Sequence, residues 1–456
     1  MKKLFIINLL ALLMYGNTTA QQIYSLDDCR RMALENNAKI KEARLAIEQA
    51  REQEHEAFSK YFPTVSATGS YFKANDYMMK EKISLTEEQQ QKLGEIIGNL
   101  GLDPSALSSL PTSYTLEAID HGSLVNVMAM LPLYAGGQIT AGNKLARLQT
   151  QVRNLQMQQS RDEVVRTTEL YYNRLLALGE KLHTLDAVEK QLAQIHNDAQ
   201  NAYEGGLATK NDLLTVELKQ NEIAASRLKL ENGLKLSKMI LAQYMGATDE
   251  EIAIDTVLPQ ELPPPASCFT DHTAALDCRP EAQLLEKNVE ANKLQTKLKK
   301  GALLPTLAVG GAGIYQDLSN TGYYKAIGLA TLSVPISEWW SGSHSVRHQQ
   351  IAVQTAMLER ENNRQLLLIQ MQGAYDDLVN SYRQIELARK SIEKSSENLR
   401  LSRDNYQAGN APMSDLLDAQ TQEQQAHDRY TDAVTQYLDC RTAYLIVTGR
   451  GAGMEK

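Results

Sequence analysis

The feature that most constrains this chain is an internal repeat. Short motifs recur in the same order in both halves of the sequence. The recurring pairs are Ala33-Leu34 and Ala275-Leu276, Phe62-Pro63-Thr64 and Leu304-Pro305-Thr306, Leu131-Pro132 and Val334-Pro335, Tyr203-x-x-Gly206 and Tyr406-x-x-Gly409, and Asp212-Leu213-Leu214 and Asp415-Leu416-Leu417. Because self-similarity at fixed spacing marks a duplicated structural unit, we predict two copies of one unit. The spacing changes once, which places an insertion at residues 73–122, in the first copy only.

The two copies set the predicted domain boundaries. The first copy spans residues 21–246 and the second spans 274–449, followed by a short tail at 450–456. Residues 247–273 contain Pro259 and Pro263-Pro264-Pro265 and are predicted to be the linker, because proline clusters mark loops.

The N-terminus has the pattern of an export signal. Lys2 and Lys3 precede an apolar run that is too short to span a bilayer, and Thr18-Thr19-Ala20 supplies small residues at a cleavage site. We therefore expect residues 1–20 to be removed. An exported chain can form disulfides, so its four cysteines could form pairs in three ways or remain free thiols. They are Cys29, Cys268, Cys278 and Cys440.

Each copy is predicted to hold a helix, two strands, a long helix and a shorter return helix. Strands are indicated by small, β-branched and aromatic residues with alternating apolar positions, and the long helices by apolar residues at 3-and-4 spacing without proline. In the first copy these elements span 26–61, 64–72, 124–131, 138–203 and 209–246. In the second copy the strands span 306–315 and 325–334, with Asn320 and Gly322 in the loop between them, and the helices span 343–406 and 414–448.

These lengths exclude an ordinary globular domain. A helix of about 65 residues extends roughly 100 Å. Four strands of about nine or ten residues match tilted membrane strands, yet the smallest membrane barrels have eight strands and open sheet edges are not tolerated in lipid. The chain must therefore oligomerise to complete its sheet. Two copies give eight strands with a filled lumen, and three give twelve strands with room for a channel.

The order of elements, the duplication and several motifs together resemble the TolC-type outer-membrane efflux family. The motifs are Leu-Pro-Leu-Tyr-Ala-Gly-Gly at 131–137, its degenerate partner at 334–342, and the paired Tyr-x-x-Gly and Asp-Leu-Leu segments. The resemblance covers essentially the whole mature chain. It implies a mixed, mostly α fold, in which a homotrimer forms a twelve-stranded outer-membrane β-barrel, four strands per protomer, above a periplasmic α-helical barrel. The insertion would lengthen the first extracellular loop.

The resemblance also implies partners and a role. The partners are outer-membrane lipid, a periplasmic adaptor and an inner-membrane transporter, of the proton-driven resistance-nodulation-division type or of the ABC type. The protein would be the passive exit duct of a tripartite efflux system. Two alternatives stay open: the duct of a type I polypeptide secretion system, and a periplasmic coiled-coil scaffold without a pore.

Two turns join the long helices to the return helices. Gly206 and Gly409 are predicted left-handed C-caps, and Thr209 with Asp212 a capping box, so helix-hairpin chemistry alone accounts for them. The resemblance implies a second role, as periplasmic tips that dock the adaptor through an apolar patch containing Leu207 and Met413. The residues assigned to the tips are Gly205, Gly206, Leu207, Ala208, Thr209, Gly409, Asn410, Ala411, Pro412 and Met413.

Acidic residues follow both turns. Asp415 and Asp418 lie one helical turn apart and share a face. Interaction with the helix N-terminus accounts for Asp415 and its counterpart Asp212 better than for Asp418. The resemblance assigns Asp415 and Asp418 to acidic rings that line a closed periplasmic aperture and attract cations. Asp212 and Tyr406 belong to the same assignment, although Ala411 stands where the family has a basic partner for the tyrosine.

Aromatic residues lie near the predicted strand ends, where such residues anchor a barrel at the lipid interface. They are Tyr71, Phe72, Tyr315, Tyr323, Tyr324, Trp339 and Trp340. Core packing is the alternative, but the only two tryptophans fall together at a predicted boundary, which favours the interface.

Other functional classes lack support in the sequence. There are 47 basic and 55 acidic residues, a net charge of −8, so a nucleic-acid-binding surface is not expected. The common motifs of hydrolases, zinc proteases and nucleotide-binding proteins do not occur, so we expect no enzyme and no cofactor. His344 and His348 have metal-compatible spacing but no third ligand nearby, so we predict a solvated helix face.

Overall fold

The computed structural model describes residues 23–100, 113–247, 252–254, 256–259, 261–318 and 321–451. The predicted export signal lies outside these residues, as does Asn320. The chain divides into two compact units. The unit that we call the helical unit comprises the described parts of 1–52, 147–292 and 352–456, and the sheet unit comprises those of 53–146 and 293–351.

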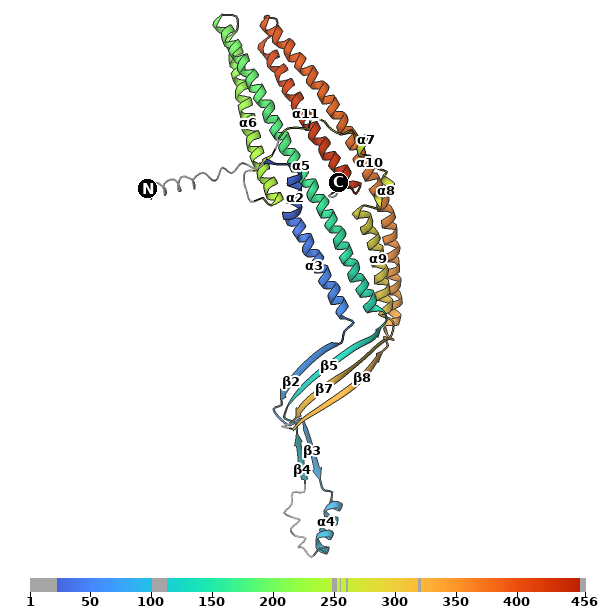
Figure 1. The fold of residues 1–456 in the computed structure, drawn as a ribbon. Helices are drawn as coiled ribbons and strands as arrows, with labels where there is room; N and C mark the ends of the chain where they lie inside the picture. The colour runs from blue at the N-terminus through green and yellow to red at the C-terminus, as the bar shows by residue number, and fades with distance from the viewer. Residues whose placement is uncertain are drawn as a thin grey trace, which may run out of the picture. The chain divides into compact units, whose positions relative to one another are not determined.

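The sheet unit is built on a four-stranded antiparallel sheet in the order β2-β5-β7-β8 (Figure 1). The strands are β2 (Thr64–Lys73), β5 (His121–Ala135), β7 (Thr306–Leu318) and β8 (Thr321–Ser333). All four predicted strands are confirmed. One detail was wrong, because Gly322 lies within β8 opposite Asp317 rather than in the loop. The strand ladder simply continues further toward the turn than side-chain alternation indicated.

The register gives the sheet two chemically different faces, since successive side chains of a strand point to opposite sides. One row across all four strands consists of Ala67, Val127, Gly313 and Ala326. The adjacent row on the other face consists of Thr68, Asn126, Ile314 and Lys325. We call the first face, which carries Val65, Ala67, Val125, Val127, Ala129, Tyr315 and Tyr324, the apolar sheet face.

The insertion at 73–122 has secondary structure of its own. Strands β3 (Met79–Ser84) and β4 (Ser113–Ala118) form an antiparallel hairpin, and helix α4 spans Glu87–Asn99. The expectation of a merely longer loop was therefore incomplete. Backbone bonds join the hairpin to the main sheet, with Ala74 N donating to Asp120 O at 2.6 Å and Met78 N to Ile119 O at 2.9 Å.

The helices repeat in the predicted order. The first copy has α2 (Leu26–Asn36), α3 (Ala38–Ser59), α5 (Gln138–Glu204) and α6 (Lys210–Met245). The second has α9 (Pro280–Gly301), α10 (Glu338–Gln407) and α11 (Met413–Val447), after the short helices α7 (Pro265–Cys268) and α8 (His272–Leu276). A two-residue parallel pair joins β1 (Ile23–Tyr24) to β6 (Ala253–Ile254). The predicted single helix at 26–61 is broken at Asn37, whose side-chain amide donates to Tyr244 O at 2.8 Å.

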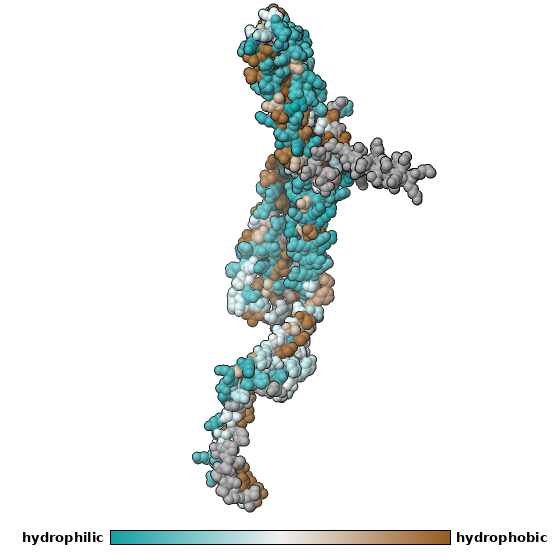
Figure 2. All heavy atoms as spheres, turned by 90° about the vertical axis from the view of Figure 1, so that its left-hand side faces the viewer, coloured by the Kyte–Doolittle hydropathy of each residue, from teal (hydrophilic) through white to brown (hydrophobic). Residues whose placement is uncertain are grey.

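The helices share several small apolar clusters instead of one large core. One cluster packs α2, α5 and α6 around Leu175 and Leu241, and another packs the ends of α5, α6, α10 and α11 around Leu192 and Leu416. On the face drawn in Figure 2, hydrophilic residues cover most of the helices. All four cysteines are free thiols. Within the described ranges, no helix combines the length and apolarity needed to cross a membrane.

Candidate functional site

The ends of α5 and α10 close with the same backbone motif. Gly206 and Gly409 have φ of +73° and +72°, a left-handed conformation that favours glycine. Leu207 N donates to Ala202 O at 2.7 Å, and Asn410 N donates to Asn405 O at 2.9 Å. These bonds, with shorter-range partners at the two glycines, form a Schellman motif at each tip. The predicted C-caps are therefore confirmed in both copies.

The return helices begin differently in the two copies. At α6, Thr209 Oγ1 accepts from Asp212 N at 3.2 Å, while Asp212 Oδ2 accepts from Thr209 N at 2.9 Å. This reciprocal pair is the predicted capping box. At α11 the N-cap is Pro412, and no side chain caps the helix. The sequence-related tips are thus chemically unequal.

The predicted apolar patch at the tips is only half correct. Leu207 is 89% exposed, so its side chain is free to contact a partner. Met413 is only 1% exposed and packs in the cluster that contains Leu416, Leu417 and Leu192. It belongs to the hairpin core because it shares one α11 face with Leu416 and Leu417, at i, i+3 and i+4. The other tip residues, from Gly205 to Thr209 and from Gly409 to Pro412, are exposed or half-buried.

The acidic residues assigned to the aperture divide into two kinds. Asp212 is engaged in the capping box, which accounts for its position without any channel. Asp415 and Asp418 are both exposed on α11. Tyr406 is half-buried, and its pKa is raised by burial and by the nearby carboxylates of Asp212 and Asp198. The fold therefore places Tyr406 beside acidic groups, and Ala411 supplies no basic partner for it.

The aromatic residues of the strands lie on both sides of the sheet. Tyr71, Tyr315 and Tyr324 belong to the apolar sheet face, and Tyr315 stands directly opposite Tyr324. Phe72 and Tyr323 lie on the other face. Each tyrosine of the opposed pair covers a glycine on the neighbouring strand, because a Cβ at Gly313 would lie 3.3 Å from Tyr324 Oη and one at Gly322 would lie 2.9 Å from Tyr315 Oη. Aromatic cover of this kind stabilises glycine positions in a sheet.

The tryptophans lie in the first turn of α10, which begins earlier than predicted, and not at a strand end. Trp339 Nε1 donates to Leu303 O at 2.9 Å, while Trp340 is largely exposed. Close by, Gly136 has a φ of +61° and lies against Gly301. A Cβ added to Gly136 would stand 2.1 Å from the Gly301 carbonyl oxygen. This close backbone approach accounts for Gly136 in the 131–137 motif.

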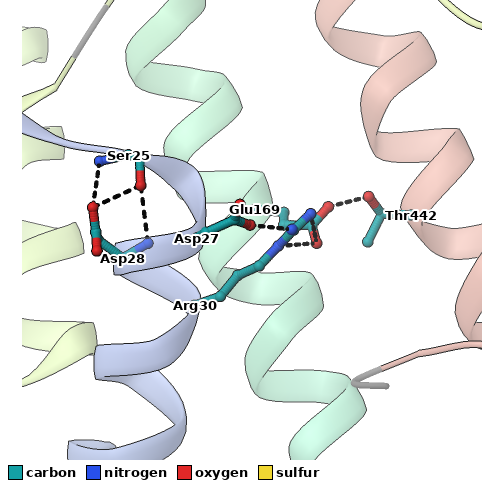
Figure 3. Close-up of polar contacts among 6 residues, drawn as sticks. All are labelled: Ser25, Asp27, Asp28, Arg30, Glu169 and Thr442. Atoms are coloured by element: carbon teal, nitrogen blue, oxygen red, sulfur yellow. Dashed lines mark hydrogen bonds and ion pairs between the residues drawn. The ribbon is translucent and has the colours of Figure 1, made fainter. Parts of the chain in front are cut away.

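A buried polar cluster in the helical unit was not found from the sequence (Figure 3). Arg30 of α2 donates from Nε to Glu169 Oε1 of α5 at 2.9 Å, and Thr442 of α11 donates to the other oxygen of Glu169. Arg30 also pairs with Asp27 at 2.7 Å, and Glu169 is only 6% exposed. The cluster joins three helices that are distant in sequence. The only sequence signal was an acidic residue on the apolar side of a long helix.

The same region contains a second carboxylate in an unusual environment. Asp439 of α11 accepts from Asn173 Nδ2 at 2.7 Å and lines a cavity of about 280 Å³ with Leu170, Arg174 and Thr435. Burial, with a smaller contribution from Glu169, raises the pKa of Asp439 to about 6. His344 and His348 are exposed on α10, and among the described residues no cluster of three potential metal ligands occurs.

Comparison with known proteins identifies related molecules. A family model described as outer membrane efflux protein matches residues 30–247 and 273–444. Among solved structures, the chain resembles the CmeC outer membrane channel of Campylobacter jejuni, with 13% identity, a TM-score of 0.72 and coverage of 97% of this chain and 92% of that one. It also resembles VceC of Vibrio cholerae, with 14% identity, a TM-score of 0.71 and coverage of 93% and 96%.

A third similar structure is the open state of the MtrE outer membrane channel of Neisseria gonorrhoeae, with 16% identity, a TM-score of 0.67 and coverage of 94% of this chain and 91% of that one. No protein of curated function matches the sequence. At these identities the structural likeness shows a common fold.

Proposed function

This chain belongs to the outer membrane efflux protein family, and from that premise we propose that three copies form the passive exit duct of a tripartite efflux system. In this proposal three sheets close a twelve-stranded barrel in the outer membrane, and the helices form a tunnel in the periplasm. An inner-membrane transporter, of the resistance-nodulation-division or ABC type, supplies the energy and reaches the duct through a periplasmic adaptor.

The observation that carries the proposal is the unfinished sheet. Strands β2 and β8 form its two edges, and no other described strand pairs with their outer sides. One face is apolar over its whole width, and residues such as Val65, Val125 and Val127 are exposed on it. An apolar sheet face with two open edges is unsuited to water or to lipid until further copies close it. Three copies supply twelve strands.

The helices support the same assembly. On α10 the side chains of Leu358, Leu366 and Ile369 are exposed, eight and three residues apart. On α6 Leu218, Leu228 and Leu236 are exposed as well. Exposed apolar side chains along a helix are typical of surfaces that pack against another helix.

The aperture and the docking surface are part of the proposal. Asp415 and Asp418 from three chains would place six carboxylates around the axis and favour cations. In each copy, the exposed Leu207 in the turn between α5 and α6 would contact the adaptor. The strand tyrosines of the apolar sheet face, with Trp340, would lie at the membrane interface.

The test is planar-bilayer conductance of the purified mature protein. We compare wild type with the double variant Asp415→Asn plus Asp418→Asn, which removes charge while keeping side-chain size. The control is Asp415→Glu plus Asp418→Glu, which retains the charge. Cation-selective channels whose selectivity weakens only in the Asn variant support the proposal. Folded oligomers that never conduct would favour a scaffold without a pore.

A further inference from the structure

The insertion carries apolar side chains that the described residues of the sheet unit leave exposed or half-buried. On α4 and at its C-cap, Leu93, Ile96, Ile97 and Leu100 follow i, i+3, i+4 and i+7 spacing and form what we call the α4 apolar face. No residue of α4 is buried, and Ile96 is 56% exposed. On the hairpin, Met79, Ile83 and Leu116 share one face and are also exposed.

Elements of this size do not hold together alone. An isolated two-stranded hairpin is marginally stable in water, and a 13-residue helix is at the lower limit for independent helicity. The N-terminus of α4 is nevertheless capped, because Gln89 Oε1 accepts a hydrogen bond from Thr86 N at 3.1 Å. The polar side of α4 carries Glu88, Gln91 and Glu95. The helix is therefore built to present one apolar side to a partner and the other to water.

The position of the insertion in the sheet indicates the partner. The inserted chain leaves from the end of β2, which is an edge strand, and returns through β5 beside it. In the trimer of the proposed function, that edge is completed by β8 of a neighbouring copy. The three insertions consequently emerge at the same end of the barrel, each beside a junction between copies.

From these placements we infer that the insertion is a trimerisation element, and that the α4 apolar faces of three copies pack together at the outer end of the barrel. The inference rests on the proposed trimer but goes beyond it, because the barrel and tunnel need no contact between insertions. The occupant of each face is the same face of another copy of this chain.

Disulfide cross-linking tests the inference in the full-length protein. Ile96→Cys is made in a Cys278→Ser background, which removes the exposed native thiol. The matched control is Gln91→Cys, on the polar side of the same helix. After oxidation, the expected result is covalent dimers in at least half of the Ile96→Cys chains and at least tenfold fewer in the control. Mass measurement and bilayer conductance of the same samples report independently on trimers and channels.

Other outcomes overturn the inference. If trimers conduct but Ile96→Cys forms no dimers, the α4 faces do not meet, whereas the proposed function stands. Quenching of a bimane label at this position by brominated phospholipid would then assign the face to the bilayer. Ready reaction with a water-soluble maleimide would leave it open to another protein. A wild-type chain that never forms trimers would overturn the proposed function and this inference with it.

Discussion

The buried polar cluster allows a quantitative prediction for Arg30→Ala. The change leaves the Glu169 carboxylate, which is 6% exposed, without its cationic partner. Removing one partner of a buried ion pair costs about 3 to 5 kcal/mol. Because 22% of the Arg30 side chain remains accessible, we expect a loss below that range, about 2 to 3 kcal/mol in the free energy of unfolding.

A neighbouring arginine provides the matched control. Arg31 lies on the same helix and pairs with Asp28 at 2.6 Å, but 66% of its side chain is accessible. Exposed ion pairs contribute about 0 to 1 kcal/mol, so Arg31→Ala should have little effect. Both variants exchange arginine for alanine in one helix, which cancels most of the difference in helix propensity.

The assay is urea unfolding followed by far-UV circular dichroism, at one protein concentration because assembly affects apparent stability. Glu169→Gln removes the buried charge, so the double variant Arg30→Ala plus Glu169→Gln should recover most of the loss. Equal stabilities of Arg30→Ala and Arg31→Ala would refute the reasoning. So would a double variant that shows no coupling between the two positions.

Three further predictions concern the helical unit. The pKa of Asp439 is about 6 in the folded state, above the unfolded value of about 3.9. The folded state therefore binds more protons between these two values, and wild type loses stability as pH rises through them. Thermal melts between pH 4 and 7 should show that Asp439→Asn gains stability relative to wild type, by up to roughly 2 kcal/mol. Leu207→Ala should leave the melting temperature unchanged while weakening binding to the proposed adaptor in a pull-down. Met413→Ala should lower the free energy of unfolding by about 2 to 5 kcal/mol. Equal effects of the two variants on stability would contradict the assignment of Leu207 to the surface and Met413 to the core. Gly409→Ala should cost about 1 to 2 kcal/mol, since its left-handed φ alone opposes a side chain there, and an unchanged urea midpoint would count against that backbone conformation.

Most of the fold could be predicted from the sequence because its signals are local. Tip glycines end the long helices, and the prolines at 63 and 305 separate helix from strand. The duplication supplied each signal twice. The helix within the insertion was not predicted, although Thr86 and Gln89 have the spacing of a capping box at a helix start.

The site was predicted less completely, for two physical reasons. Met413 follows a turn proline and was grouped with the exposed tip, although its spacing to Leu416 and Leu417 placed it on the buried face. The contacts of Asn37 with Tyr244 O and of Arg30 with Glu169 join segments more than a hundred residues apart. Such partners depend on how helices pack, which no local pattern encodes.

The open edge at β8 has a consequence for biogenesis. This strand runs for 13 residues with a single charge, Lys325, and no proline, so it has few of the usual devices that block pairing with a wrong strand. In the proposed trimer another copy completes this edge, so a newly exported subunit can either pair in register with that copy or aggregate. Correct pairing needs an encounter between subunits, so its rate depends on their concentration. An edge left open during transit would need a cover, and a holding chaperone for unassembled subunits would serve that purpose.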